Sequence, residues 1–158
     1  MADLHITRIF NAPRATVWDA WTQPETMKKW WGPACFTAPV IENDLRVGGK
    51  YLYCMRGAPG EGMPEQDFWS AGEYVEVIPM EKIVATDHFA DKDGNTINPK
   101  DMGLPGEWPE EMRATVVFED EGEGKTKVTI THVGHPVEIL KDAETGWNQQ
   151  LDKLVAIL

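Results

Sequence analysis

The sequence predicts a single α+β domain in which a curved antiparallel sheet wraps a long C-terminal helix and encloses an apolar pocket. Three observations favour this fold. Seven segments rich in β-branched and aromatic residues are joined mostly by turns, two short helical patterns follow the first segment, and an apolar stripe at helical spacing closes the chain. A chain of 158 residues can bury a substantial core, so we expect one domain over residues 1–158.

The N-terminal part is expected to hold one strand and two short helices. Leu4–Phe10 alternates apolar and polar residues, which is the period of a half-buried strand. Pro13 suits the first turn of a helix, and apolar residues then follow at helical spacing. Thr22 as a cap and Pro24 just inside the start indicate a second short helix, which stops at Gly32.

The middle of the chain is typical of strands joined by turns, punctuated by Gly, Pro, Asp and Asn. The segments are Cys35–Ile41, Lys50–Met55, Phe68–Ile78, Lys82–Phe89, Met112–Phe118 and Lys125–His132. Consecutive strands with short connections predict an antiparallel meander, because parallel pairs need long crossovers. Two longer connections, residues 57–67 and 90–110, are typical of lids that gate a site.

The last segment returns to helical spacing and is expected to pack on the sheet. Its apolar stripe consists of Trp147, Leu151, Leu154, Val155 and Leu158. Gly146 costs about 1 kcal/mol against alanine inside a helix. We therefore expect either that the helix begins at Gly146 or that this residue approaches the sheet closely.

Charge and composition exclude several classes of partner. Fifteen basic and 26 acidic residues give a net charge of −11, which repels phosphate backbones and anionic lipid head groups. Nucleic acid and membrane are therefore not expected partners. The N-terminus lacks a basic segment followed by an apolar core, and no apolar run approaches the length of a bilayer span. We expect a cytoplasmic protein.

The cysteine and histidine patterns predict no metal and no cofactor. Cys35 and Cys54 are expected to be reduced side chains that fill space in the core. His132-x-x-His135 has ligand-like spacing, yet the sequence places no further ligands beside it, and zinc needs more than two. We therefore interpret His132 and His135 as two polar side chains at the end of a sheet.

The sequence predicts no catalytic residues. Asp87 and His88 are adjacent on a strand and therefore point to opposite faces, so they cannot readily act as an acid–base pair. No nucleophile elbow, phosphate-binding loop or dinucleotide fingerprint occurs in the chain. An enzyme is not the expected class, although a histidine or carboxylate that points into a cavity would favour one.

Several motifs together resemble one known family. They are Arg8-x-Phe10-x-Ala12-Pro13, Val17-Trp18-x-Ala20-Trp21-Thr22-x-Pro24, Trp30-Trp31-Gly32-Pro33, Asp44-x-Arg46-Val47-Gly48-Gly49, Gly72-x-Tyr74-x-Glu76-Val77-x-Pro79-x-Glu81-Lys82-Ile83 and Gly146-Trp147-x-x-x-Leu151-x-x-Leu154. In this order they are similar to the family related to the C-terminal domain of the activator of heat shock protein 90 ATPase. That family belongs to the START-like, birch-pollen-allergen-like superfamily, also called SRPBCC.

The resemblance implies a helix-grip fold with a cavity between the sheet and the C-terminal helix. In superfamily members this cavity accepts lipids, polyketides, sterols or other apolar molecules, and no catalytic motif comes with the family. The resemblance also implies two alternatives, a chaperone ATPase activator and an enzyme of the cyclase or hydrolase kind. The co-chaperone itself carries a separate N-terminal domain that makes much of the chaperone contact, and this chain resembles only the other half.

Strand alternation and the helical stripe predict which residues line the cavity. The predicted wall consists of Trp31, Tyr51, Tyr53, Met55, Trp69, His88, Met112, Trp147, Leu151 and Leu154. On one strand the choice between Ala85 with Asp87 and Thr86 with His88 stays open. Periodicity also cannot distinguish a lined cavity from a filled core.

The leading hypothesis is a module that binds an apolar or amphipathic small molecule between the sheet and the C-terminal helix. A chaperone protein is the alternative partner. The sequence identifies neither the ligand nor the oligomeric state.

Overall fold

The computed structural model describes residues 2–109 and 111–158. The elements are β1 (Ala2–Phe10), α1 (Arg14–Thr22), α2 (Pro24–Met27), β2 (Thr37–Asn43), β3 (Lys50–Gly57), β4 (Gln66–Ile78), β5 (Lys82–Ala90), η1 (Pro99–Met102), β6 (Met112–Gly122), β7 (Lys125–His135), η2 (Val137–Ile139) and α3 (Leu140–Ile157). The predicted α+β class, with seven strands, two short helices after the first strand and a long C-terminal helix, is confirmed.

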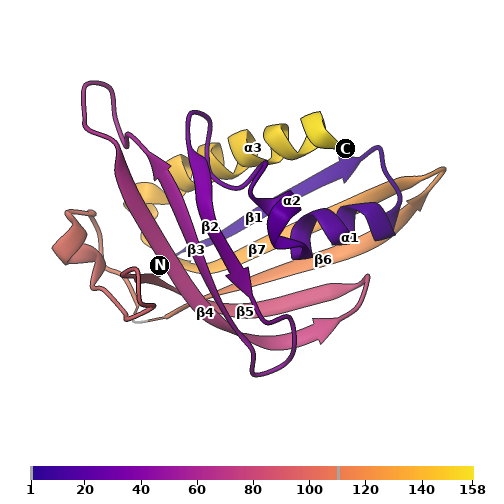
Figure 1. Ribbon diagram of the computed structural model, residues 1–158, viewed down its shortest axis with the longest axis horizontal. Helices are drawn as coiled ribbons and strands as arrows, with labels where there is room; N and C mark the ends of the chain where they lie inside the picture. The colour runs from indigo at the N-terminus through magenta and orange to yellow at the C-terminus, as the bar shows by residue number, and fades with distance from the viewer. Residues whose placement is uncertain (1, 110) are drawn as a thin grey trace.

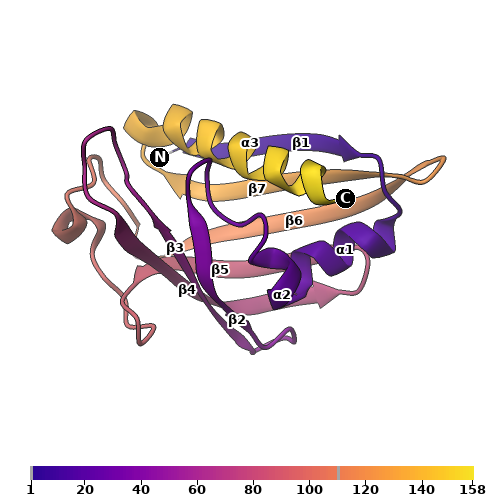
Figure 2. The same cartoon turned by 45° about the horizontal axis from the view of Figure 1, so that its top comes forward.

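The strands form one antiparallel sheet in the order β1-β7-β6-β5-β4-β3-β2 (Figure 1). Strands β2 to β7 follow one another as a meander, and β1 then pairs with β7. As a result β1 and β2, which are neighbours in sequence among the strands, occupy opposite edges of the sheet. The sheet is strongly bent, and α1, α2 and α3 lie on its concave side (Figure 2).

Helix α3 differs from its predicted form at both ends. It begins at Leu140, so the prediction that the helix could start at Gly146 is wrong. A side-chain carbon added at Gly146 would meet Pro33 at 3.6 Å, which is an ordinary contact with a loop and not with the sheet. Val155 and Leu158 are 51% and 37% exposed, so their placement in the apolar stripe is also wrong.

Two local predictions near the helices are corrected. Thr22 is the last residue of α1 and donates its hydroxyl to the Trp18 carbonyl at 2.8 Å, and Gln23 takes the position before α2. Cys35 is exposed and precedes β2 in a left-handed conformation with φ of 68°, so it does not fill the core. Cys54 is fully buried, as expected.

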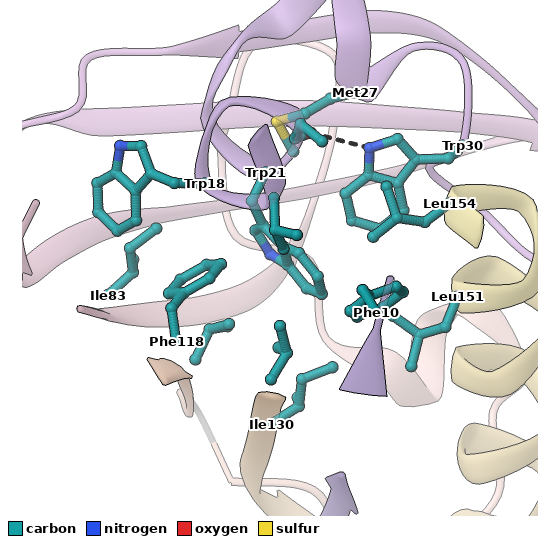
Figure 3. Packing of buried hydrophobic residues seen from close by; sticks show 14 of the residues in the cluster. Phe10, Trp18, Trp21, Met27, Trp30, Ile83, Phe118, Ile130, Leu151 and Leu154 are labelled. Atoms are coloured by element: carbon teal, nitrogen blue, oxygen red, sulfur yellow. Dashed lines mark hydrogen bonds between the residues drawn. The ribbon is translucent and has the colours of Figure 1, made fainter. Parts of the chain in front are cut away.

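One end of the concave side is filled by large rings. Trp21 of α1 meets Trp30 and Phe118 edge to face, with ring centroids 4.8 and 5.7 Å apart (Figure 3). Leu151 and Leu154 of α3 are 0% exposed in the same cluster. We call this region, made of Phe10, Trp18, Trp21, Trp30, Phe118, Leu151 and Leu154, the packed end.

Candidate functional site

The register of the strands decides which side chains face the helices. Ser70 stands between Tyr53 and Phe89 of the neighbouring strands, so the three share the concave face. Asp87 lies two residues before Phe89 and therefore points to that face as well. His88 belongs to the convex face.

Two adjoining cavities lie on the concave face, next to the packed end. The inner cavity has a volume of about 90 Å³ and reaches toward Trp21 and Met27. The outer cavity, of about 320 Å³, extends past Met112 and Trp108. Both cavities are lined by Trp31, Ser70, Asp87, His132 and Trp147, which we call the waist. Together the two cavities and the waist form the open end of the molecule.

Aromatic rings make most of the apolar wall. Trp31 packs edge to face on Tyr53 and on Trp147, with centroids 5.1 and 5.7 Å apart. Trp31 also meets Trp30 at 5.4 Å, so the wall continues directly into the packed end. Such edge-to-face pairs fix ring orientation beyond the effect of burial alone.

Trp31 is held in this wall by α3. The Lys153 ammonium donates to the carbonyl oxygens of Trp31, Gly32, Pro33 and Phe36, at 3.4, 2.9, 3.4 and 3.1 Å. The side chains of Gln150 and Gln149 accept from the amides of Gly32 and Ala34, at 2.7 and 3.2 Å. These contacts provide hydrogen-bond partners for backbone N–H and C=O groups of a loop that has no regular secondary structure to pair them. We call residues 31–36 the clamped loop.

A tyrosine hydroxyl contacts the one carboxylate at the waist. Tyr51 Oη lies 2.8 Å from the Thr86 carbonyl oxygen and 3.0 Å from Asp87 Oδ1. Gly72 stands opposite Tyr51, and a side-chain carbon there would come within 2.6 Å of the tyrosine ring. The absence of a side chain at Gly72 therefore leaves the space in which the ring of Tyr51 lies.

A buried histidine completes the polar group. His132 Nε2 lies 3.1 Å from Asp87 Oδ2, and His132 is only 8% exposed. The distance is that of an ion pair, but the approach lacks hydrogen-bond geometry, and neither ring nitrogen has a hydrogen-bond partner among the described residues. An unsatisfied buried polar group costs about 1–3 kcal/mol.

His135 is neutral at physiological pH. Burial and the neighbouring His132 lower its pKa from 6.5 to about 4. Its Nδ1 lies 3.3 Å from the carbonyl oxygen of His132, which only accepts, so this nitrogen carries the proton. The two imidazole rings pack edge to face with centroids 4.4 Å apart.

The tyrosines of the inner cavity are neutral donors. The hydroxyls of Tyr53 and Tyr74 lie 3.2 Å apart and hydrogen-bond to each other. Burial raises the pKa of Tyr51 and of Tyr53 well above 10.0, with the charge of Asp87 a further cause in both cases. The inner cavity is therefore an apolar space with hydroxyl groups on its wall.

The predicted wall residues are distributed over three places. Trp31, Tyr51, Tyr53, Met55, Met112 and Trp147 line one or both cavities. Leu151 and Leu154 lie in the packed end and touch neither cavity. Trp69 and His88 lie on the convex face, opposite Cys54 and Ala71 of the neighbouring strands, and the concave positions belong to Ser70 and Asp87. His88 is nevertheless among the residues that line the outer cavity.

Three important residues of the site were missing from the prediction. His132 follows Val128 and Ile130 at a period of two, and this alternation could have placed it on the inner face. Asp87 follows Ile83 and Ala85 in the same way, although the choice of face was left open there. Trp108 had no such signal, because it lies in the loop between β5 and β6.

Groups of side chains that could hold a metal ion and helices that could cross a membrane are both absent from the described part of the chain. In residues 2–109 and 111–158 no group of three or more His, Cys, Asp or Glu side chains is placed to hold a metal ion. Nor does any helix in these ranges have the length and apolar character needed to cross a membrane.

Comparison with known proteins gives the family. Residues 11–158 match the model of the family described as Activator of Hsp90 ATPase homolog 1-like protein. The chain belongs to this family. The expected resemblance is thereby confirmed, whereas no curated protein matches the chain.

Several solved structures share the fold over nearly the whole length. Protein CV1439 from Chromobacterium violaceum is 30% identical, covers 98% of this chain and 95% of its own, and superposes with a TM-score of 0.75. Protein Ms6760 from Mycobacterium smegmatis is 26% identical, with 99% and 90% covered and a TM-score of 0.78. A protein from Staphylococcus epidermidis is 29% identical, with 99% and 88% covered and a TM-score of 0.72.

Proposed function

We propose that this member of the Activator of Hsp90 ATPase homolog 1-like family binds an apolar or amphipathic small molecule at its open end. The observation that carries the proposal is the pair of adjoining cavities of about 90 and 320 Å³, walled by aromatic rings and carrying a few convergent polar groups. Mostly apolar concave sites with a small number of placed polar groups are the usual form of small-molecule sites. The fold of the family is compatible with such binding.

The size of the site limits the ligand. The outer cavity, at about 320 Å³, is within the range of ordinary ligand pockets, whereas the inner cavity of about 90 Å³ admits only a small apolar group. We therefore expect a body of one or two fused rings, or a chain of similar volume, with one end directed past the waist.

Methylnaphthalene is a suitable first probe, because its fluorescence and that of Trp31 and Trp147 report on contact between them. We expect saturable binding to the wild-type protein, followed by fluorescence titration and by native mass spectrometry without detergent. Ala143→Phe places a ring in the outer cavity and should weaken binding about tenfold or more, because Ala143 lines that cavity.

The matched control is Ala156→Phe, at an exposed position of the same helix. It should bind as the wild type does. Absence of saturable binding to the wild type, or equal binding by both variants, would contradict the proposal.

A second candidate is activation of a chaperone ATPase, favoured by the description of the family to which the chain belongs. A coupled ATPase assay with heat shock protein 90 tests it directly. Increased turnover at saturating protein would support this candidate, and unchanged turnover would exclude it.

A third candidate, an enzyme of the cyclase or hydrolase kind, would use the same open end. It is favoured by Asp87, a carboxylate that points inward beside His132. Naphthyl acetate is a simple probe for the hydrolase form. Hydrolysis faster than in buffer, and lost in Asp87→Asn, would support this candidate. If the protein does not accelerate hydrolysis, the hydrolase form is excluded.

A further inference from the structure

We propose that the open end selects ligands whose apolar body carries a hydroxyl group, which donates to Asp87 at the waist, and that it rejects ligands with a carboxylate. This inference rests on the proposed binding function and names the class of ligand. Four features of the site support it. They are the free acceptor positions of Asp87, the ring nitrogens of His132 that lack hydrogen-bond partners among the described residues, the charges of the wall and the position of the waist.

The Asp87 carboxylate accepts fewer hydrogen bonds than it can. An ionised carboxylate offers about four acceptor positions. Tyr51 carries a single hydroxyl hydrogen, and two acceptors share it, the Thr86 carbonyl at 2.8 Å and Asp87 Oδ1 at 3.0 Å. The side chain of Asp87 is only 18% exposed, so water replaces few of the missing donors. A donor from a ligand would satisfy this acceptor.

His132 points to the same conclusion independently. It lines both cavities, it is about nine-tenths buried, and neither of its ring nitrogens has a hydrogen-bond partner among the described residues. A hydroxyl group both donates and accepts. A hydroxyl bound to Asp87 therefore brings an acceptor oxygen next to the imidazole that already lies 3.1 Å from the carboxylate.

The charges of the wall oppose an anionic ligand. Two carboxylates, Asp87 and Asp142, line the described cavity walls, and no lysine or arginine does. Lys153 of α3 is directed to the four carbonyls of the clamped loop. His135 supplies no compensating charge at neutral pH, because its pKa is lowered to about 4. A bound carboxylate would lie in a space of low polarity without a partner, which is costly.

The position of the waist sets the shape of the ligand. Asp87 and His132 line both cavities, and so do Trp31 and Trp147, whose rings pack on each other. A hydroxyl at the waist thus leaves apolar groups on either side of it. A phenol or an aliphatic alcohol with a compact ring system meets these requirements.

Three probes of equal body size test the inference, namely naphthol, methylnaphthalene and naphthoic acid. By titration calorimetry at neutral pH, we expect wild-type protein to bind naphthol at least about tenfold more tightly than naphthoate. Naphthol donates a hydrogen bond to Asp87, whereas naphthoate brings a second negative charge beside it. Methylnaphthalene should fall between them.

Asp87→Asn keeps the shape of the side chain and removes its charge. We expect the preference for naphthol over naphthoate to fall about tenfold in this variant. Asp19→Asn is the matched control, because it removes the same unit charge at an exposed position of α1, outside both cavities. Its preference should equal that of the wild type.

The outcomes separate the two proposals. Naphthoate binding as tightly as naphthol, or a preference that Asp87→Asn leaves unchanged, would overturn the hydroxyl inference and leave the binding function intact. If none of the three probes binds, methylnaphthalene included, the binding function fails as well. The wild-type ranking decides the inference even where Asp87→Asn does not fold.

Discussion

The packed end and the open end lie under the same helix, and they differ within about one helical turn. Leu151 and Leu154 are completely buried among rings, whereas Trp147, four residues earlier, is partly exposed and lines both cavities. Four residues correspond to about 6 Å along a helix. The interior of this fold therefore changes from filled to hollow over a very short distance.

The cause of the difference is the coverage of the sheet. At the packed end, α1 and α2 lie beside α3 on the concave side of the sheet. Trp18 and Trp21 of α1, together with Trp30, which follows α2, fill the bend (Figure 3). At the open end no helix takes that place in the described structure, and the cover comes from the clamped loop and from Trp108 of the β5–β6 loop. The filled interior and the two cavities therefore occupy separate parts of one curved surface.

Large-to-small substitutions test this division most strongly. Leu151→Ala should lower the free energy of unfolding by about 3 kcal/mol, because it leaves a void among fully packed side chains. Met55→Ala, on the wall of the outer cavity, should cost less than about 1 kcal/mol, because that side chain is only partly buried and borders space already empty. Urea unfolding measures both, and equal losses would contradict the division.

The pH dependence of stability tests the burial of His135 beside the open end. Its folded pKa of about 4 lies below the ordinary 6.5, so the unfolded chain binds this proton more readily. The stability due to the neutral ring is complete above pH 6.5 and is lost as the pH falls toward 4. We expect a loss of about 2 kcal/mol from this residue.

Urea unfolding of the wild type and of His135→Gln across that pH range isolates the effect. The wild type should lose stability more steeply than the variant, because glutamine does not titrate. Parallel curves would show that His135 is not held neutral by the fold.

The clamped loop connects the two ends and gives the smallest effect. Lys153→Met keeps most of the apolar stem but removes the donor shared by four carbonyl groups. We expect a loss of about 1.5 kcal/mol, together with weaker binding of methylnaphthalene, because Trp31 is no longer fixed in the wall. Lys29→Met, at an exposed position, should change stability by less than about 0.5 kcal/mol. Unchanged binding in Lys153→Met would separate the clamped loop from the site.

Much of the wall could be predicted because alternation along a strand is a local property. Tyr51, Tyr53 and Met55 follow from one period-two pattern, and the structure places all three on the concave face. On β4 the same alternation predicts Trp69 as a wall residue, but the structure places Ser70 on the concave face instead. Burial of a side chain depends on what covers each face, and the sequence of one strand does not contain that information.

The contact between Asp87 and His132 also could not be predicted from any one strand. Asp87 and His132 are far apart in the sequence, with the β5–β6 loop and all of β6 between them. They meet because β5 and β7 both pair with β6. The sequence places His88 next to Asp87, but the residue that the fold brings to the Asp87 carboxylate is His132, from the far side of β6.

By itself the sequence determined the order of strands and helices, the antiparallel meander, the acidic charge and the family, since each is written in local periodicity or in ordered motifs. Only the tertiary structure decided where the interior is hollow, which face His88 and Trp69 take, and that Asp87, His132 and Tyr51 converge. The physical reason is that cavities and polar clusters arise from the bend of the sheet and from what packs against it. Those are relations between distant segments, and no single segment encodes them.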